Sequence, residues 1–181
     1  MYHGSSSKKA NSIMNEGFAL GKGQRSGFMG ATFTVDNQGI FLSDNKQAAR
    51  FFGEDRSGSP GEAQVLTCYA DTSRVMPAEQ APREILRLGV SIINKYDNSN
   101  KSRLAVRDWW RLLDRGEFVS AIKKMGYTGV SFREDAFLNL PGRTYLIFDP
   151  STIKIRGKQG DGINNVRDFF ASQIQPELAN E

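Results

Sequence analysis

The segment Gly39-Ile-Phe-Leu-Ser-Asp44, followed by Asn45-Lys-Gln-Ala-Ala-Arg-Phe-Phe-Gly53, has the pattern of a strand that runs directly into a helix. The apolar residues before Ser43 predict a short strand. Ser43 and Asp44 are typical helix N-cap residues, and the apolar side chains that follow predict a helix ending at Gly53. We therefore expect a strand, a cap and a helix at this point of the chain.

A second unit of this kind stands at the N-terminus, where Tyr-His-Gly-Ser at residues 2–5 leads into a short amphipathic helix. The helix is predicted from Ser7, and Gly17 is placed to end it in a left-handed cap. An imidazole at a strand end, a glycine and the free amides of a helix start together suit a polar ligand or a phosphate. The alternative is that His3 lies in a frayed terminus, because chain ends are often poorly ordered.

The rest of the chain predicts a single mixed domain. Residues 19–38 contain four glycines and predict a mobile loop with at most a short strand near 31–35. Further strands are expected at 65–70, 129–132, 145–148 and 152–156, and helices at 85–93, 102–113 and 118–125. The loop 134–142 separates two of these strands. We expect a domain over residues 1–157 and a polar tail over 158–181, with one helical turn near Phe169 and Phe170.

Composition excludes several classes of protein. The 181 residues are 39% hydrophobic, enough for a core without disulfide or metal support. One cysteine, Cys68, and one histidine, His3, exclude disulfide frameworks, cysteine zinc sites and HExxH metalloproteases. Neither a signal peptide nor an apolar run of about 20 residues is present. We expect a soluble, cytoplasmic-type monomer without a metal, and delivery into another cell or a virion stays open.

Three stretches, in this order along the chain, resemble motifs of the poly(ADP-ribose) polymerase-like ADP-ribosyltransferases. His3-Gly-Ser5 and the helix after it are similar to the family's first motif, and residues 39–52 are similar to its Gly-Ile-Tyr-Phe-Ala-Asp strand and following helix. Thr144-Tyr-Leu-Ile-Phe-Asp-Pro150 is similar to the strand that carries the catalytic glutamate. Gly126-Tyr-Thr-Gly-Val130 also resembles small phage and bacterial members. Together the motifs cover most of residues 2–155.

The resemblance implies an α/β (α+β) ADP-ribosyltransferase fold, in which helices flank a split, mostly antiparallel sheet that binds NAD⁺ as substrate. The implied reaction is mono-ADP-ribosyl transfer to a macromolecular acceptor, protein rather than nucleic acid, with release of nicotinamide. The family's roles assign the nicotinamide-side ribose to His3 and the carboxamide to Gly4, with Ser5 and Ser43 at the cofactor-binding site. Phe41 replaces the family's stacking tyrosine, and keeps the ring face while it loses the hydroxyl.

A second aromatic wall is expected at Phe51 or Phe52. Because adjacent helix residues point in different directions, we expect one ring near the ligand and the other in the core. The resemblance also puts Thr144 at the position of the family's catalytic glutamate, and threonine supplies a hydrogen bond without charge. Members without this glutamate are mono-ADP-ribosyltransferases or inactive. Glu134, in the loop before this strand, either supplies the missing carboxylate or is an ordinary solvated residue.

Four arginines recur every fourth residue along and around the predicted helix 102–113. They are Arg103, Arg107, Arg111 and Arg115, opposite an expected inward face of Val106, Trp109, Trp110 and Leu113. They form either a basic ridge for phosphate or an acidic partner, or the solvated face of an amphipathic helix. We favour the solvated face, with Asp108 and Asp114 as local partners.

Two other functions stay open. The threonine at position 144 motivates a catalytically inactive module that binds NAD⁺ or ADP-ribose. The net charge of +4 and the arginines motivate an ADP-ribosyltransferase-fold enzyme that acts on nucleic acid, either by ADP-ribosylating it or by removing an RNA 2′-phosphate. A single histidine argues against the phosphotransferase. Because the histidine stands at position 3, few residues precede the functional end of the first strand, and we expect an excised domain.

Overall fold

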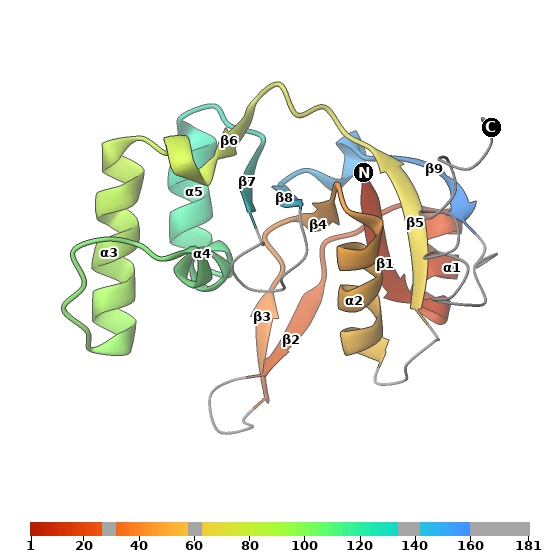
Figure 1. Cartoon of the computed structure of the whole chain (residues 1–181), viewed down its shortest axis with the longest axis horizontal. Coiled ribbons are helices and arrows are strands. Elements are labelled where there is room, and N and C mark those ends of the chain that lie inside the picture. The colour runs from red at the N-terminus through yellow and green to blue at the C-terminus, as the bar shows by residue number, and fades with distance from the viewer. Residues whose placement is uncertain (27–31, 58–62, 134–141, 160–181) are drawn as a thin grey trace, which may run out of the picture.

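The computed structural model describes residues 1–26, 32–57, 63–133 and 142–159, which form a mixed α/β structure (Figure 1). Seven strands form one sheet in the order β6-β7-β8-β4-β1-β5-β9, and β2 and β3 form a separate hairpin. The sheet strands are β1 (Tyr2–Ser6), β4 (Ile40–Ser43), β5 (Ala63–Tyr69), β6 (Val75–Pro77), β7 (Gly129–Arg133), β8 (Arg143–Ile147) and β9 (Lys154–Gln159). The hairpin strands are β2 (Lys22–Ser26) and β3 (Thr32–Asp36). The α-helices are α1 (Ser7–Glu16), α2 (Lys46–Ser57), α3 (Arg83–Asp97), α4 (Val106–Leu113) and α5 (Gly116–Lys124).

The sheet is mostly antiparallel, as the resemblance implies, and among the described strands one neighbouring pair, β6 and β7, runs parallel. Its two parts meet at a narrow join. β1 and β4 share one register pair, Tyr2 with Ser43, whereas β1 and β5 are paired along the whole of β1. The group β1–β5–β9 and the group β4–β8–β7–β6 therefore diverge from each other beyond Tyr2. This divergence leaves space between two strands at the middle of the sheet.

Helices cover both faces of the sheet. In the β4–β8 pair, Phe41 lies opposite Leu146, and both pack on the core beneath α3, α4 and α5. Their neighbours Ile40 and Ile147 belong to a second core, which Ala10 of α1 also enters. Since successive strand residues point to opposite faces, β4 and β8 stand between the two cores. Packing on both faces thus fixes the position of β4 and β8 beside the β1–β4 join.

α2 packs unusually close to β1, and the residues at this contact are small. A Cβ atom on Gly4 would overlap the Ala49 carbonyl oxygen, and one on Gly53 would lie 2.8 Å from the Ser5 nitrogen. Glycine at both positions lets the helix backbone approach the strand backbone directly. The prediction that Gly53 ends this helix is therefore wrong, because α2 continues to Ser57 and Gly53 serves close packing instead.

The predicted caps are also corrected in part. Gly17 does end α1 with a positive φ of 81°, but its ψ of −177° lies outside the left-handed helical region. For α2, the capping residue is Asn45 and not Ser43 or Asp44, because the Asn45 Oδ1 accepts hydrogen bonds from the backbone N–H groups of Gln47 and Ala48. The Ser43 hydroxyl instead accepts the Asn45 N–H at 3.0 Å. These bonds turn the chain sharply from β4 into α2.

α4 differs from the predicted helix 102–113. It begins at Val106, which is exposed, and its buried residues include Asp108 as well as Trp109, Leu112 and Leu113. The Asp108 carboxylate accepts hydrogen bonds from Lys101 Nζ at 2.6 Å and the Ala105 N–H at 2.8 Å. Asp108 is therefore not an ion-pair partner of the arginine stripe, because it caps its own helix from the inside. Arg111 pairs instead with Asp97 at 2.5 Å.

Two strands were not predicted, and one boundary moves. β2 lies in the expected loop 19–38 and pairs with β3, which agrees with the short strand expected near 31–35. The short strand β6 adds to the edge of the sheet. β9 continues past Gly157 to Gln159, so the sheet includes two residues that the sequence assigns to the tail. The turn expected near Phe169 and Phe170 lies outside the described residues. Within the described part, no helix combines the length and the apolar character that a membrane span requires.

Candidate functional site

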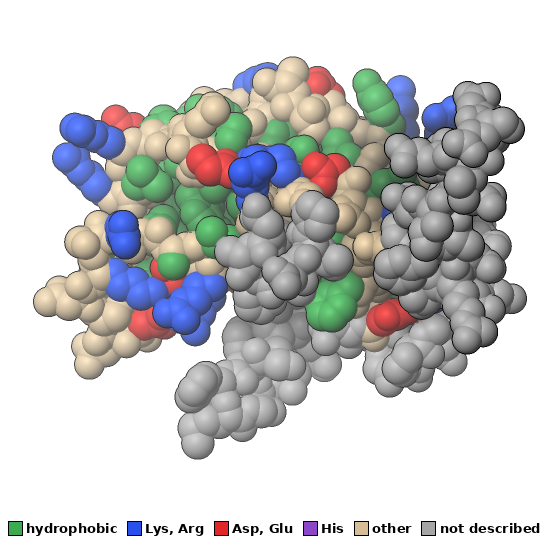
Figure 2. Space-filling model, in the orientation of Figure 1, with side chains coloured by type: hydrophobic (Ala, Val, Ile, Leu, Met, Phe, Trp, Pro, Cys, Tyr) green, Lys and Arg blue, Asp and Glu red, His purple; other side chains and the backbone are tan. Residues whose placement is uncertain are grey.

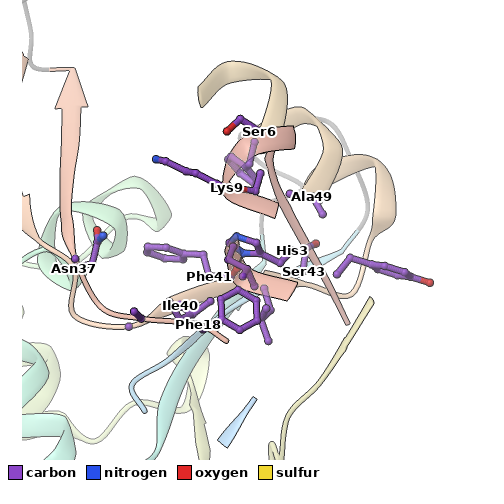
Figure 3. Close-up of a pocket in the computed structure, with 18 of the residues that line it drawn as sticks. His3, Ser6, Lys9, Phe18, Asn37, Ile40, Phe41, Ser43 and Ala49 are labelled. Carbon is purple, nitrogen blue, oxygen red and sulfur yellow. Dashed lines mark hydrogen bonds between the residues drawn. The ribbon is translucent and has the colours of Figure 1, made fainter. Parts of the chain in front are cut away.

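A cavity of about 370 Å³ opens where β1 and β4 separate. Its wall combines β1, α1 and the segment after it, the chain between Asn37 and Ser43, two residues of α2, and one residue each of α4 and β8. Figure 3 shows His3 at the centre of this space, with Lys9 and Ser6 on the α1 side and Asn37 at the entry to β4. The volume falls within the range of small-molecule binding sites.

The imidazole of His3 bridges the gap between the separated strands. Its Nδ1 lies 2.9 Å from the Phe41 carbonyl oxygen. Because a carbonyl can only accept, Nδ1 carries the proton, and in the neutral ring Nε2 is the acceptor nitrogen. The edge of the Phe18 ring packs against the imidazole, with the ring centres 5.0 Å apart. His3 is therefore fixed in place, which contradicts the alternative of a frayed terminus.

Residues before His3 are held as well. The amino group of Met1 donates to the Cys68 carbonyl at 2.9 Å, and the Cys68 N–H donates to the Met1 carbonyl at 2.8 Å. The first residue thus continues the pairing of β1 with β5. His3 and Gly4 consequently stand on a strand that is hydrogen-bonded on its β5 side from the start of the chain.

An aromatic cluster forms one wall of the cavity. The Phe41 ring lies 4.9 Å from that of Trp110 and is inclined to it by 31°, and Phe52 lies 5.6 Å from Trp110. The sequence predicts Trp110 only as part of the inward face of its helix. Its indole instead lies between two site residues, and all three rings line the cavity.

The two adjacent phenylalanines of α2 differ in their surroundings. Phe52 lines the cavity and is partly buried, whereas Phe51 is 46% exposed and does not line it. The expectation that one ring lies near the ligand position agrees with Phe52. The expectation that the other ring lies in the core is wrong, because Phe51 points to solvent and touches Phe52 from outside.

Ser43 and Thr144 place two hydroxyl groups side by side. They form a register pair between β4 and β8, and both are buried, Thr144 to 2% exposure. The Thr144 Oγ1 has no hydrogen-bond partner among the described residues, although Thr144 lines the cavity. A buried hydroxyl without a partner destabilises a fold by about 1–3 kcal/mol. An incoming polar ligand could supply that partner.

The start of β8 is held by a small polar network beside Thr144. The Arg143 N–H donates to Asp44 Oδ1 at 2.7 Å, and its guanidinium donates to Glu79 at 2.8 Å. The hydrogen bond that Arg143 donates to Glu79 raises the pKa of Arg143, and burial opposes this. Burial also acts to raise the pKa of Glu79, but the hydrogen bond and charge of Arg143 outweigh it and lower that pKa. Both groups thus stay charged, and their bonds hold the start of β8 and with it Thr144 in place.

Charged groups at the cavity are few. Among the described lining residues, the one lysine or arginine is Lys9 in the first turn of α1, and the one carboxylate is Glu16 in its last turn. Glu134, the other acid assigned to the site, lies outside the described residues. The described residues contain no cluster of three or more His, Cys, Asp or Glu side chains that could hold a metal ion.

The structure brings together most of the residues that the sequence assigns to one site. The lining residues include His3, Gly4, Ser5, Phe41, Ser43, Phe52 and Thr144. Sequence reasoning missed Lys9, Asn37 and Trp110. Lys9 could have been predicted from its position at the start of a helix that begins beside the site. No local sequence pattern distinguishes Trp110 from Trp109.

Comparison of the chain with protein-family models, with curated proteins and with solved structures gave no match.

Proposed function

We propose that the chain has an ADP-ribosyltransferase fold and transfers one ADP-ribose from NAD⁺ to a protein acceptor, with release of nicotinamide. The observation that carries this proposal is the convergence of His3, Phe41 and Thr144 on one cavity. These residues come from three motifs up to 141 positions apart, and each motif resembles the same family. If the three resemblances were due to chance, there would be no reason for these residues to lie around the same cavity.

The nicotinamide riboside end of NAD⁺ fits the inner part of the cavity. Nε2 of His3 accepts a hydrogen bond from a ribose hydroxyl, because the Phe41 carbonyl holds the proton on Nδ1. The nicotinamide ring stacks on Phe41, which Trp110 supports from behind. Gly4 lies beyond the single β1–β4 register pair, so the edge of its backbone that faces β4 is not paired in the sheet and can meet the carboxamide.

Lys9 gives the outer part of the cavity its positive charge. It stands beside Ser6 at the start of α1, where backbone N–H groups are not yet hydrogen-bonded within the helix. Phosphate groups favour such positions, because the amides and the helix dipole attract negative charge. We therefore assign the diphosphate of NAD⁺ to this end, with Lys9 as its cation.

Departure of nicotinamide builds positive charge on the ribose, and a nearby carboxylate stabilises it. Thr144 can donate a hydrogen bond to the ribose 2′-hydroxyl through its unpartnered Oγ1, but it adds no charge. Glu134 follows Arg133 in the sequence, and β7 pairs with β8 so that Arg133 stands opposite Arg143, next to Thr144. We assign the missing carboxylate to Glu134.

The second candidate function is a module that binds NAD⁺ or ADP-ribose without reaction. The observation that favours it is Thr144 itself, because the described lining residues nearest the expected ribose hold hydroxyls and no carboxylate. Both functions place the ADP-ribose part of the nucleotide in the same cavity. They differ only in nicotinamide release.

One experiment separates the candidates. Purified protein is titrated with NAD⁺ by calorimetry, and nicotinamide is then followed by chromatography with and without an added lysate. At a hundred times the dissociation constant, NAD⁺ should stabilise the protein by about 2.7 kcal/mol, a clear thermal shift. His3→Ala should remove most of this shift. Phe51→Ala and Phe52→Ala form a matched pair, of which only the second should weaken binding.

The outcomes are distinct. Binding with nicotinamide release that falls about a hundredfold in Glu134→Gln supports the transferase. Binding without release supports the binding module, for which Thr144→Glu should restore slow hydrolysis. Labelled ADP-ribose in the lysate that survives nuclease and is removed by protease identifies a protein acceptor. If neither NAD⁺ nor ADP-ribose binds at millimolar concentration, both functions are overturned.

A further inference from the structure

A second hollow, of about 760 Å³, lies between α3 and the segment that leads into α4. We name it the arginine groove, because Arg83 and Arg87 of α3, Arg103 and Arg133 line it. Figure 2 shows apolar side chains over α3 and α4, with Lys and Arg side chains at their border. The cavity of the proposed NAD⁺ site shares none of these lining residues.

The charge of the groove is not neutralised from within. Glu79 is the single acid among the described lining residues, and its carboxylate is bound to Arg143 at 2.8 Å. Within the described chain, none of the four arginines makes an ion pair with a carboxylate. The groove therefore presents an excess of positive charge that a negatively charged partner would complement.

The floor of the groove is apolar, and this decides between two classes of partner. Leu86 and Val90 contribute aliphatic surface, whereas Trp109 and Phe132 are 5% and 2% exposed. Binding of single-stranded nucleic acid relies on exposed aromatic rings that stack with bases, and these two rings are covered. An aliphatic floor with an arginine rim suits a protein segment that carries both apolar and acidic side chains.

The groove and the cavity share an aromatic wall. Phe132 lines the groove, and its ring lies 5.0 Å from that of Trp110, which lines the cavity. Trp109, the neighbour of Trp110, lines the groove. Two packed rings, Phe132 and Trp110, would thus separate a segment bound in the groove from the cavity.

We propose that the arginine groove binds an acidic, apolar segment of the protein that accepts ADP-ribose. The binding of such a segment follows from the charge and the floor of the groove alone. Only the statement that its owner is the acceptor rests on the proposed function. The groove would then select the acceptor, while the cavity carries out the transfer.

The test begins with a displayed library of random 12-residue peptides, selected on the wild-type protein. Selection is repeated on Arg83→Ser/Arg87→Ser and on a matched control, Lys154→Ser/Arg156→Ser, which loses the same charge from the exposed side of β9. Circular dichroism and thermal melting establish that both variants are folded. We expect wild type and control to enrich peptides with acidic and apolar residues, and the groove variant to lose at least tenfold in affinity for them.

Equal affinity of the groove variant and wild type, or no acidic and apolar enrichment, overturns the proposal. Binding of a fluorescent single-stranded oligonucleotide that the groove variant alone loses also overturns it in favour of nucleic acid. The second stage fuses an enriched peptide to a carrier protein and measures ADP-ribosylation. If NAD⁺ binds and nicotinamide is released but the fused carrier is modified no faster than the bare carrier, the groove does not select the acceptor. An absence of NAD⁺ binding, in contrast, removes the proposed function and leaves the peptide result intact.

Discussion

The two parts of the sheet reach stability by different kinds of packing. Around β1–β5–β9, α2 approaches the strand through Gly4, Ala49 and Gly53, so that backbone meets backbone. Around β4–β8–β7–β6, large side chains such as Phe118 and Phe132 fill the space beneath α3, α4 and α5. In the first part, this close packing fixes the positions of His3 and Gly4, because the two backbones have little room to move. The second behaves as an ordinary core that supports Trp110 and Phe41 from behind.

The largest expected effect lies in the side-chain core. Phe118 is fully buried and packs edge to face with Trp109 at 5.7 Å. Phe118→Ala should lower the free energy of unfolding by about 3–5 kcal/mol, because it removes buried surface and leaves a cavity. Denaturant titration measures the loss. Met125→Ala, at a half-exposed position just after α5, should change it by less than about 1 kcal/mol.

The next largest effect is expected where α2 packs backbone against backbone on β1. Gly4→Ala adds one methyl group that overlaps the Ala49 carbonyl, and neither backbone can move without disrupting the sheet. We expect a loss of about 3 kcal/mol, at the upper end for overpacking. Gly116→Ala is the matched control, because its added methyl would meet its nearest atom at 3.6 Å. Equal stability of the two variants would show that α2 is not held by direct backbone contact.

A third prediction concerns the buried carboxylate of the second part. Burial acts to raise the pKa of Asp108, but the hydrogen bonds from Lys101 and Ala105 outweigh it, so its pKa lies below the ordinary value. A lowered pKa in the folded state stabilises the fold above about pH 4, and this contribution is lost as the pH falls further. Asp108→Asn should therefore lose about 2 kcal/mol at pH 7.

The pH dependence provides the control for this third change. As the pH falls through the lowered pKa of Asp108, the Asp108→Asn variant and wild type should approach each other in stability, because the wild-type carboxylate becomes protonated. Asp36→Asn removes an exposed carboxylate and should leave the curve unchanged. If the difference between Asp108→Asn and wild type does not vary with pH, the ion pair with Lys101 does not stabilise the fold.

The same division explains what the sequence could predict. The strand and helix at the first two motifs have strong local signals, whereas only the family resemblance predicts that His3, Phe41 and Thr144 lie at one site. Trp110 could not be assigned, because its contact with Phe41 joins residues 69 positions apart and Trp109 beside it has the same local pattern. β6 has only three residues, too few for a periodic pattern. Gly53 carries the signal of a helix end, and only the proximity of β1 explains its place inside α2.

The smallest expected effect is on NAD⁺ affinity, and it tests whether Phe41, in the second part of the sheet, contacts the ligand directly. Phe41 packs on the core and on Trp110, and it also lines the cavity, so its ring belongs to both. Phe41→Tyr keeps the ring face and should bind NAD⁺ as wild type does, whereas Phe41→Ala should lose about 1 kcal/mol of stacking beyond the buried area. Calorimetric titration measures affinity, and melting measures stability. Phe118→Leu is the control, because it disturbs the same core without touching the cavity. If Phe118→Leu lowers stability but not NAD⁺ affinity, the affinity lost in Phe41→Ala comes from the stacking contact and not from a disturbed core. If Phe41→Ala melts earlier but binds NAD⁺ with unchanged affinity, the ring serves the core alone, and the ligand must be held from the β1 side.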